Sequence, residues 1–210
     1  MPATIIETDR DVERGAAYLA AREPRFAHAL ELVGKLPLRR RDSGFPELLR
    51  TICSQQLSVA AADTIWRRLV AAGATEPENL LAMDEPALRA CGLSGPKIRY
   101  VRALAEADLD YHALEDMPER EAIAELTAIK GIGVWTAEIY LMFSIGRADV
   151  FAAGDLALQE AARILFDLPE RPSERALREL AADWAPWRAV AARILWAYYR
   201  VAKQREGVTE

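Results

Sequence analysis

The spacing of apolar residues restricts the fold of this 210-residue chain more than any other feature. Apolar side chains recur every three or four residues over most of the sequence, and the alternating pattern of half-buried strands is nearly absent. The sequence therefore predicts an all-α fold with short connections. The expected helices cover residues 9–22, 24–34, 45–53, 58–72, 86–91, 96–107, 118–128, 133–145, 155–165, 173–183 and 187–203.

Two of these segments have unusual apolar patterns. Residues 134–145 are apolar on nearly every side, with Glu138 as the only charge, so this helix is expected to be buried. The last helix, 187–203, carries apolar stripes on two faces. It is therefore expected either to contact two packing partners or to line a cavity.

Composition excludes several classes of protein. Apolar residues make up 51% of the chain and charged residues 28%, as in soluble globular proteins. There is no signal-like apolar start and no apolar run near the ~20 residues of a membrane span, so we expect a cytoplasmic protein without membrane contact. The two cysteines and two histidines are scattered, which argues against a zinc site or a disulfide framework and excludes a four-cysteine iron–sulfur cluster.

The net charge of -5 argues mildly against nucleic-acid binding, because such proteins usually carry a basic surface. A few local cations and helix N-termini can still bind phosphates on an acidic protein. Candidate cations are Lys97, Arg99, Lys130 and Arg147, although each alone is typical of an ordinary solvated side chain.

A Gly-x-Gly turn lies between two predicted helices in the segment Leu126-Thr-Ala-Ile-Lys-Gly-Ile-Gly-Val-Trp-Thr-Ala137. Glycines allow a tight hairpin and a close approach of the backbone to a ligand, and the amides of the next helix suit a phosphate. Taken alone, the pattern is more often a simple turn.

A second loop, Asp149-Val-Phe-Ala-Ala-Gly-Asp155, follows the hairpin and ends in an aspartate that opens a helix. Aspartate at such a position is commonly a helix N-cap. After this hairpin, however, a catalytic carboxylate is the better interpretation, and the two roles are compatible.

These two segments together resemble the helix-hairpin-helix DNA glycosylase superfamily. Three further pieces are similar to its 3-methyladenine DNA glycosylase II branch: Ser54-Gln-Gln-Leu-Ser-Val59, Leu93-Ser-Gly-Pro-Lys97, and Trp184-Ala-Pro-Trp-Arg-Ala-Val-Ala-Ala192 leading to Trp196. The resemblance spans residues 24–201. It implies a DNA repair enzyme that removes alkylated, cationic purines such as 3-methyladenine and 7-methylguanine from double-stranded DNA.

In such an enzyme Asp155 is expected to stabilise the positive charge that develops on the sugar and to orient or deprotonate water. Family members that also cut the DNA backbone carry a lysine two residues after the second hairpin glycine. This chain has Trp135 there. The resemblance therefore implies a monofunctional glycosylase without lyase activity.

The resemblance also assigns a base pocket and a DNA wedge. Trp135 and Trp196 match pocket positions, where an indole face attracts a cationic purine by about 0.5–2 kcal/mol. Ile139 stands at the position of the family's pocket tyrosine and Tyr140 follows it. The wedge that fills the gap left by a flipped base falls in Gln55, Gln56 and Leu57, with Gln56 or Leu57 inserting, although a simple capping turn is the alternative.

The hairpin is expected to bind DNA phosphate through Gly131 and Gly133, with Lys130 and Thr136 nearby. In this superfamily it often holds a monovalent cation, which would fall on the backbone carbonyls of Thr127, Ile129 and Gly131 as Na⁺ or K⁺. No other cofactor is expected, and the protein is expected to be a monomer.

The resemblance predicts two helical lobes with an active-site cleft between them. Residues 1–44 plus 170–210 form one expected lobe, and residues 45–169 form the other, with the helix-hairpin-helix motif at about 118–145. Two alternative functions stay open: a glycosylase for a deaminated or oxidised base, and a non-catalytic DNA-binding protein that uses only the hairpin.

Overall fold

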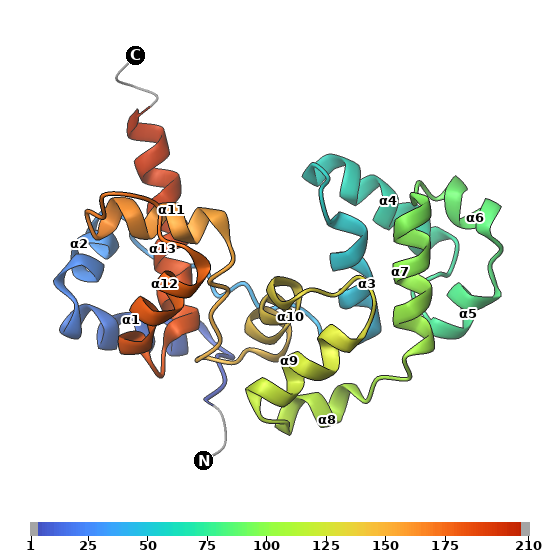
Figure 1. Cartoon of the computed structure of the whole chain (residues 1–210), viewed down its shortest axis with the longest axis horizontal. Helices are drawn as coiled ribbons and strands as arrows, with labels where there is room; N and C mark the ends of the chain where they lie inside the picture. Colours follow the sequence, from blue (N-terminus) through green and yellow to red (C-terminus); the bar gives the residue numbers. More distant parts are fainter. Residues whose placement is uncertain (1–3, 207–210) are drawn as a thin grey trace. The chain divides into compact units, whose positions relative to one another are not determined.

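The computed structural model describes residues 4–206, with side chains described as far as Lys203, and the regular secondary structure of this part is helical (Figure 1). Its one β-type pairing is an isolated antiparallel bridge between Ile5 and Arg147. The all-α expectation is confirmed. The helices are α1 (Asp9–Arg22), α2 (Pro24–Val33), α3 (Phe45–Ser54), α4 (Val59–Ala71), α5 (Pro77–Ala82), α6 (Glu85–Ala90), α7 (Gly95–Glu106), α8 (Tyr111–Asp116), α9 (Glu119–Ala128), α10 (Val134–Tyr140), η1 (Leu141–Ile145), α11 (Leu156–Leu165), α12 (Glu174–Leu180), η2 (Ala181–Trp184) and α13 (Arg188–Glu206).

Most expected helices occur within a residue or two of their predicted bounds, but two short ones were not expected. Helices α5 and α8 have six residues each, which is too short to show a repeating apolar pattern. The expected helix 133–145 also changes type part-way, because η1 is a π-helix with wider turns than α10. Residues 136–145 are all buried, which confirms the interpretation of this apolar segment.

The chain divides into two compact units. Unit 1 comprises Met1–Arg40 and Leu141–Glu210, and unit 2 comprises Arg41–Tyr140. The expected lobes put residues 141–169 with the hairpin, whereas in the structure this segment belongs with the terminal helices. The reason is packing, since α11 lies against α13 and α13 lies against α2.

Unit 1 is built around α13, which contacts α1, α2 and α11. Residues 189–195 of this helix are buried without interruption, so the two-stripe pattern reflects contact with several partners. An aromatic cluster completes the core. Phe26 meets Phe166 and Trp184 edge-on at ring-centroid distances of 5.7 and 5.1 Å, and Phe166 stacks on Trp184.

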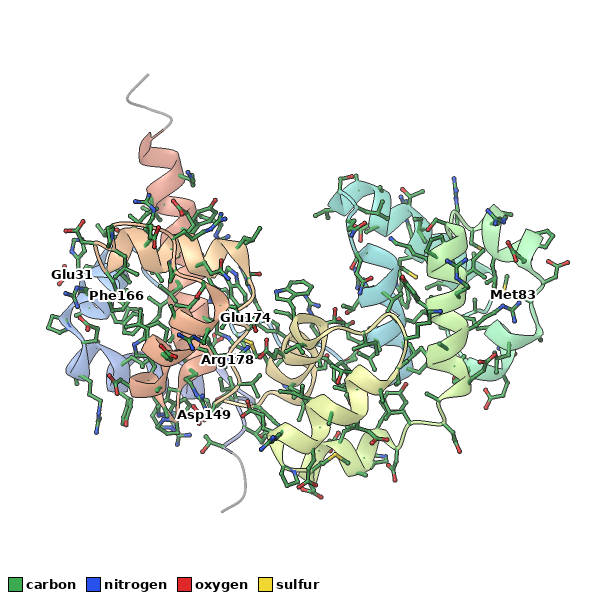
Figure 2. The ribbon with its side chains drawn as sticks, in the orientation of Figure 1. Glu31, Met83, Asp149, Phe166, Glu174 and Arg178 are labelled. Atoms are coloured by element: carbon green, nitrogen blue, oxygen red, sulfur yellow. The ribbon has the colours of Figure 1, made fainter. Side chains whose placement is uncertain are left out.

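Unit 2 is built around α3, which packs against α4 and α7, while α9 packs against α10. Leu48, Leu49 and Ile52 of α3 are fully buried. From α7, Arg102 donates a 2.6 Å hydrogen bond to the carbonyl of Met83, the residue that follows α5 and is labelled in Figure 2. Unit 2 thus holds the hairpin on a helical scaffold of its own.

Candidate active site

The hairpin lies in unit 2, where residues 129–133 connect α9 to α10. The Ile132 amide donates to the Ile129 carbonyl at 3.1 Å, which closes the turn. Gly131 has a φ of +99°, and a Cβ atom there would lie 2.5 Å from Cβ and Cγ of Tyr100 on α7. Glycine is therefore required at this position both by backbone conformation and by close packing.

Gly133 differs from Gly131. A Cβ atom built on Gly133 would meet nothing within 4 Å, and its φ lies outside the left-handed region. The absence of a side chain is therefore not needed for folding. It leaves the backbone at the start of α10 open to an incoming ligand, as the phosphate-binding hypothesis requires.

The candidate wedge loop is attached to the hairpin by Gln55. Its Nε2 donates to the Gly131 carbonyl at 3.1 Å and to Thr136 Oγ1 at 3.4 Å. Thr136 is buried, so its hydroxyl serves this internal contact, whereas Lys130 is exposed. Gln55 and Thr136 thus join the two segments within unit 2.

The other two residues of the loop remain accessible. Gln56 is exposed and has a φ of +57°, a conformation that a non-glycine residue adopts at a cost. Leu57 is 41% exposed. Both therefore remain candidates for insertion into DNA.

The predicted cations separate into exposed and internal side chains. Lys97 donates from Nζ to the Cys53 carbonyl near the end of α3, and burial lowers the pKa of this lysine. Arg147 is buried. These two side chains support the fold, while Arg99 and Lys130 are exposed and available to phosphates.

The predicted pocket residues of unit 2 also differ in exposure. Trp135 is 41% exposed on the first turn of α10. Ile139 and Tyr140 are buried, and the Tyr140 hydroxyl accepts a 2.8 Å hydrogen bond from the Gly44 amide. The exposed indole is thus the residue of this set that is most available to a ligand.

Asp155 lies in unit 1, where it caps the N-terminus of α11. Its Oδ1 atom accepts hydrogen bonds from the amides of Ala157 and Leu158 at 2.9 and 3.0 Å. The same oxygen accepts a bond of 3.2 Å from Nε1 of Trp196 on α13. Three donors on one oxygen fix the orientation of the carboxylate, so the capping role and a catalytic role are compatible.

The loop that carries Asp155 is fixed at several points. Arg188 pairs with both oxygens of Asp149 at 2.8 and 2.9 Å. Gln159 Nε2 donates to the Ala153 carbonyl at 2.9 Å, and Arg178 donates to the Phe151 carbonyl at 3.3 Å. These contacts hold both ends of the loop against α11, α12 and α13.

Helix α12 contributes an ion pair beside this loop. Arg178 lies next to Glu174 in Figure 2, and the two side chains pair at 2.9 Å. A Cβ atom on Gly154 would lie 3.3 Å from the Glu174 carboxylate. The glycine that precedes Asp155 therefore leaves room for this carboxylate.

Trp196 packs against a second aromatic ring in unit 1, which in turn lies next to an arginine. The Phe143 ring packs against the Trp196 ring at 5.8 Å with an interplanar angle of 32°. The Arg193 guanidinium lies 4.8 Å from the centroid of the Phe143 ring. Burial and the nearby Arg39 and Arg40 lower the pKa of Arg193 to about 10, so the group stays charged at neutral pH.

Two of the three carbonyls expected to hold a monovalent cation, those of Ile129 and Gly131, have acceptor capacity left. Ile129 and Gly131 each accept one hydrogen bond from protein donors, and a carbonyl oxygen has two lone pairs. Both oxygens can therefore accept an ion as well. Within residues 4–206, no group of three or more His, Cys, Asp and Glu side chains is placed to hold a metal ion.

Residues 49–186 match the model described as HhH-GPD superfamily base excision DNA repair protein. The chain belongs to this family. The matched range includes the wedge loop, the hairpin and the Asp155 loop.

Known members of the HhH-GPD superfamily are similar over most of the chain. A DNA-3-methyladenine glycosylase 1 from Schizosaccharomyces pombe is 33% identical over 197 residues, covering 88% of this chain and 86% of that protein. The solved structure of the S. pombe 3-methyladenine DNA glycosylase in complex with abasic DNA has a TM-score of 0.75 at 34% identity, covering 87% of this chain and 95% of that one. A DNA-3-methyladenine glycosidase from Bacillus halodurans has a TM-score of 0.83 at 33% identity, covering 97% and 95%.

Several residues that contact the Asp155 loop or pack beside Trp196 in this HhH-GPD protein could not be identified from the sequence. Arg188 and Gln159 hold the loop, yet each is ordinary for a helix at its position. Phe143 and Arg193 were also missed. A signal for Arg193 existed, because it is the only charged residue between Ala189 and Leu195.

The remaining tryptophans differ in burial. Trp184 and Trp187 are buried core residues, but Trp66 is only half-buried and has Arg50 over its ring. Over the described residues, no helix has the length and apolarity needed to cross a bilayer.

Proposed function

We propose that this protein is a monofunctional DNA glycosylase that removes alkylated purines such as 3-methyladenine and 7-methylguanine from double-stranded DNA. The proposal rests mainly on the orientation of the Asp155 carboxylate, which two backbone amides and Trp196 fix by hydrogen bonds. The chain combines this carboxylate with a hairpin whose backbone is open at Gly133. Relatives that share most of its length are named for 3-methyladenine removal.

In the proposed reaction the bond between C1′ and the base nitrogen breaks, and its electron pair goes to the departing base. Positive charge develops on the sugar, where the Asp155 carboxylate stabilises it. A water oxygen then bonds to C1′ and releases a proton, which Asp155 is suited to accept. The products are the free base and an abasic site in an unbroken strand.

DNA binding in this proposal uses the exposed features of unit 2. Lys130 and the open backbone at Gly133 would contact phosphates, and Gln56 or Leu57 would fill the gap left by the flipped base. A Na⁺ or K⁺ ion held by the Thr127, Ile129 and Gly131 carbonyls would supply further positive charge. We expect the protein to bind as a monomer.

Trp135 and Trp196 remain the residues predicted to contact the flipped base. An indole face attracts a cationic purine, which favours alkylated bases over their normal counterparts. Both side chains retain partial exposure, as a ligand contact requires.

We expect Trp135→Lys to leave the protein without strand-cutting activity. A nucleophilic lysine needs a depressed pKa, which burial or a nearby cation would provide. Position 135 is 41% exposed, so an amine there stays protonated and unreactive at neutral pH. Gel analysis of product DNA without alkali checks this result, and efficient cleavage by the variant would contradict it.

We expect Trp196→Phe to lower the excision rate about tenfold through loss of the hydrogen bond to Asp155, since such bonds to a charged group contribute about 1.5–3 kcal/mol when buried and less when half-exposed. The aromatic ring is kept, so the melting temperature should change little. Trp66→Phe is a matched control, because it removes a half-buried indole from unit 2 and should leave the rate unchanged. Equal rates for Trp196→Phe and wild type would show that the hydrogen bond does not serve catalysis.

The test of the proposed function is a panel of duplexes, each with one defined lesion: 3-methyladenine, 7-methylguanine, 1-methyladenine, ethenoadenine or hypoxanthine. Release of the cationic purines with an alkali-sensitive product is the expected result. Release of hypoxanthine alone would assign a different lesion class, that of deaminated bases. Binding without release of any base would identify a DNA-binding protein.

A further inference from the structure

Arg40 of unit 1 is an exposed arginine whose guanidinium is held on one side by the protein. Its Nη1 atom donates to the Ser144 carbonyl and, at 3.5 Å, to the Phe143 carbonyl. A Cβ atom on Gly146 would lie 2.7 Å from Nη1, so this glycine, at a φ of +86°, leaves the space that the guanidinium fills. An exposed arginine usually samples several rotamers, and these contacts restrict Arg40 before any ligand binds.

The other side of this guanidinium makes no hydrogen bond within the protein. An arginine has five N–H donors, and over residues 4–206 the Nε and Nη2 atoms of Arg40 have no partner and no carboxylate pairs with the side chain. The Nε–Nη2 edge is the one that can bind a phosphate or a carboxylate through two parallel hydrogen bonds. Arg40 therefore offers a restrained cationic edge to an anion from outside the chain.

The segment that carries Arg40 is anchored to α13 by a buried arginine. Arg193, which is 2% exposed, donates from Nε and Nη2 to the Leu38 carbonyl at 3.3 and 3.1 Å and from Nη1 to the Ala189 carbonyl at 2.9 Å. Burial, and then the charges of Arg39 and Arg40, lower the pKa of Arg193 to about 10. Three positive charges thus gather here, and a bound anion would reduce the repulsion among them.

These arginines lie in the unit that carries the candidate catalytic carboxylate. Phe143, whose carbonyl accepts from Arg40, packs its ring on Trp196, and Trp196 donates to Asp155. Two side chains therefore connect Arg40 to the position proposed for the sugar. The phosphate contacts proposed above all lie in unit 2, so a second contact in unit 1 would keep the strand beside the carboxylate.

We propose that Arg40 binds a backbone phosphate of the DNA near the damaged nucleotide and thereby holds the strand on the unit that carries Asp155. Arg39 and Arg193 add positive charge at the same place. A phosphate contact reads no base, so it contributes equally to the binding of damaged and undamaged DNA. This inference rests on DNA binding by the proposed glycosylase and does not depend on which base is removed.

The alternative role for Arg40 is structural. Arginine near a helix C-terminus often bonds the last carbonyls, and Ser144 lies at the end of η1. Such a cap uses only Nη1, so its loss lowers the melting temperature and leaves the DNA affinity of the folded protein unchanged. Phosphate binding instead predicts a change in affinity and in the dependence of affinity on salt.

The first measurement is binding of an abasic duplex by fluorescence anisotropy at several salt concentrations. Arg40→Gln removes the charge and retains an N–H donor. We expect its affinity to fall about three- to tenfold, and the slope of log affinity against log salt concentration to decrease in magnitude by about 0.9, the value for one phosphate contact. Arg40→Lys keeps the charge and should keep most of the slope. The control Arg25→Gln removes an exposed arginine of unit 1 that pairs with Glu23 at 3.3 Å, and it should change neither quantity.

The second measurement identifies the phosphate. Neutral methylphosphonate linkages replace the phosphates of the duplex one at a time, over one helical turn around the abasic site. At one position the replacement should weaken binding by wild type about three- to tenfold and leave binding by Arg40→Gln unchanged, because that variant has already lost the contact. At every other contacted phosphate the two proteins should lose equally. Partial unfolding of a variant would weaken binding at all positions alike, so it cannot produce this pattern.

Three results would overturn the inference. Wild-type affinity and slope in Arg40→Gln, or the absence of any phosphate at which the two proteins differ, would show that Arg40 only caps η1. An equal loss in Arg25→Gln would show that only the overall charge matters. If wild type binds DNA but removes no base, the proposed function fails while the result for Arg40 still stands, so the two failures are distinguishable.

Discussion

Replacing Asp155 with asparagine is expected to slow base excision by about a thousandfold or more while binding to abasic-site DNA is retained. The charge that would stabilise the sugar cation disappears, and losses of a single stabilising group are typically 10²–10³-fold or greater. Asparagine is also a good N-cap, and its side-chain oxygen can accept the bonds from Ala157, Leu158 and Trp196. Single-turnover excision and fluorescence anisotropy on abasic duplex measure the two properties.

The matched control for this variant is Asp110→Asn. Asp110 caps α8 with the same geometry, accepting from the amides of His112 and Ala113 at 3.0 and 2.9 Å. Both variants should lose a similar small amount of stability, and only Asp155→Asn should lose activity. If Asp155→Asn retained excision, the carboxylate mechanism would be rejected.

Replacing Gly131 with alanine is expected to destabilise unit 2 by about 3 kcal/mol or more. The φ of +99° is strained for alanine, and the new methyl group would lie 2.5 Å from the Tyr100 side chain. Thermal melting and urea unfolding measure the change. A variant with unchanged stability would show that α7 and the hairpin can move apart, contrary to the structure.

Gly133→Ala is a useful second variant, because it should change the affinity for DNA without changing the stability of the fold. The added methyl group meets nothing within 4 Å, so stability should remain within about 1 kcal/mol of wild type. Affinity for duplex DNA should nevertheless fall about tenfold, since loss of one charge-assisted hydrogen bond is worth about 1.5 kcal/mol or more. Unchanged affinity would remove Gly133 from the phosphate site.

The sequence predicted the helices well because each amphipathic helix repeats its apolar pattern locally. It also predicted the position of Asp155 at a helix start, since capping is a local property. It could not predict which helices pack together. Residues 141–169 follow the hairpin in the chain, yet α11 packs on α13, and only the tertiary structure shows this.

The sequence also could not predict which side chains of the candidate site are buried. Trp135 and Tyr140 both lie on α10, and the sequence predicted both as pocket residues. In the structure Trp135 is exposed, whereas the Tyr140 hydroxyl accepts a hydrogen bond from the Gly44 amide. Arg193 is buried beside Phe143, and its apolar neighbours in the sequence indicate burial without showing which ring it contacts. Burial depends on contacts between distant segments, which the local pattern does not encode.

The most direct test of the proposed mechanism uses a duplex that contains a single 7-methylguanine and follows both the release of free base and the damaged strand, before and after digestion with an endonuclease that cuts at abasic sites. We predict release of free 7-methylguanine, an intact strand before digestion, and a break at the lesion site after it. Strand breakage before digestion would contradict the water-dependent mechanism, and an unbroken strand after digestion would show that no base had been removed.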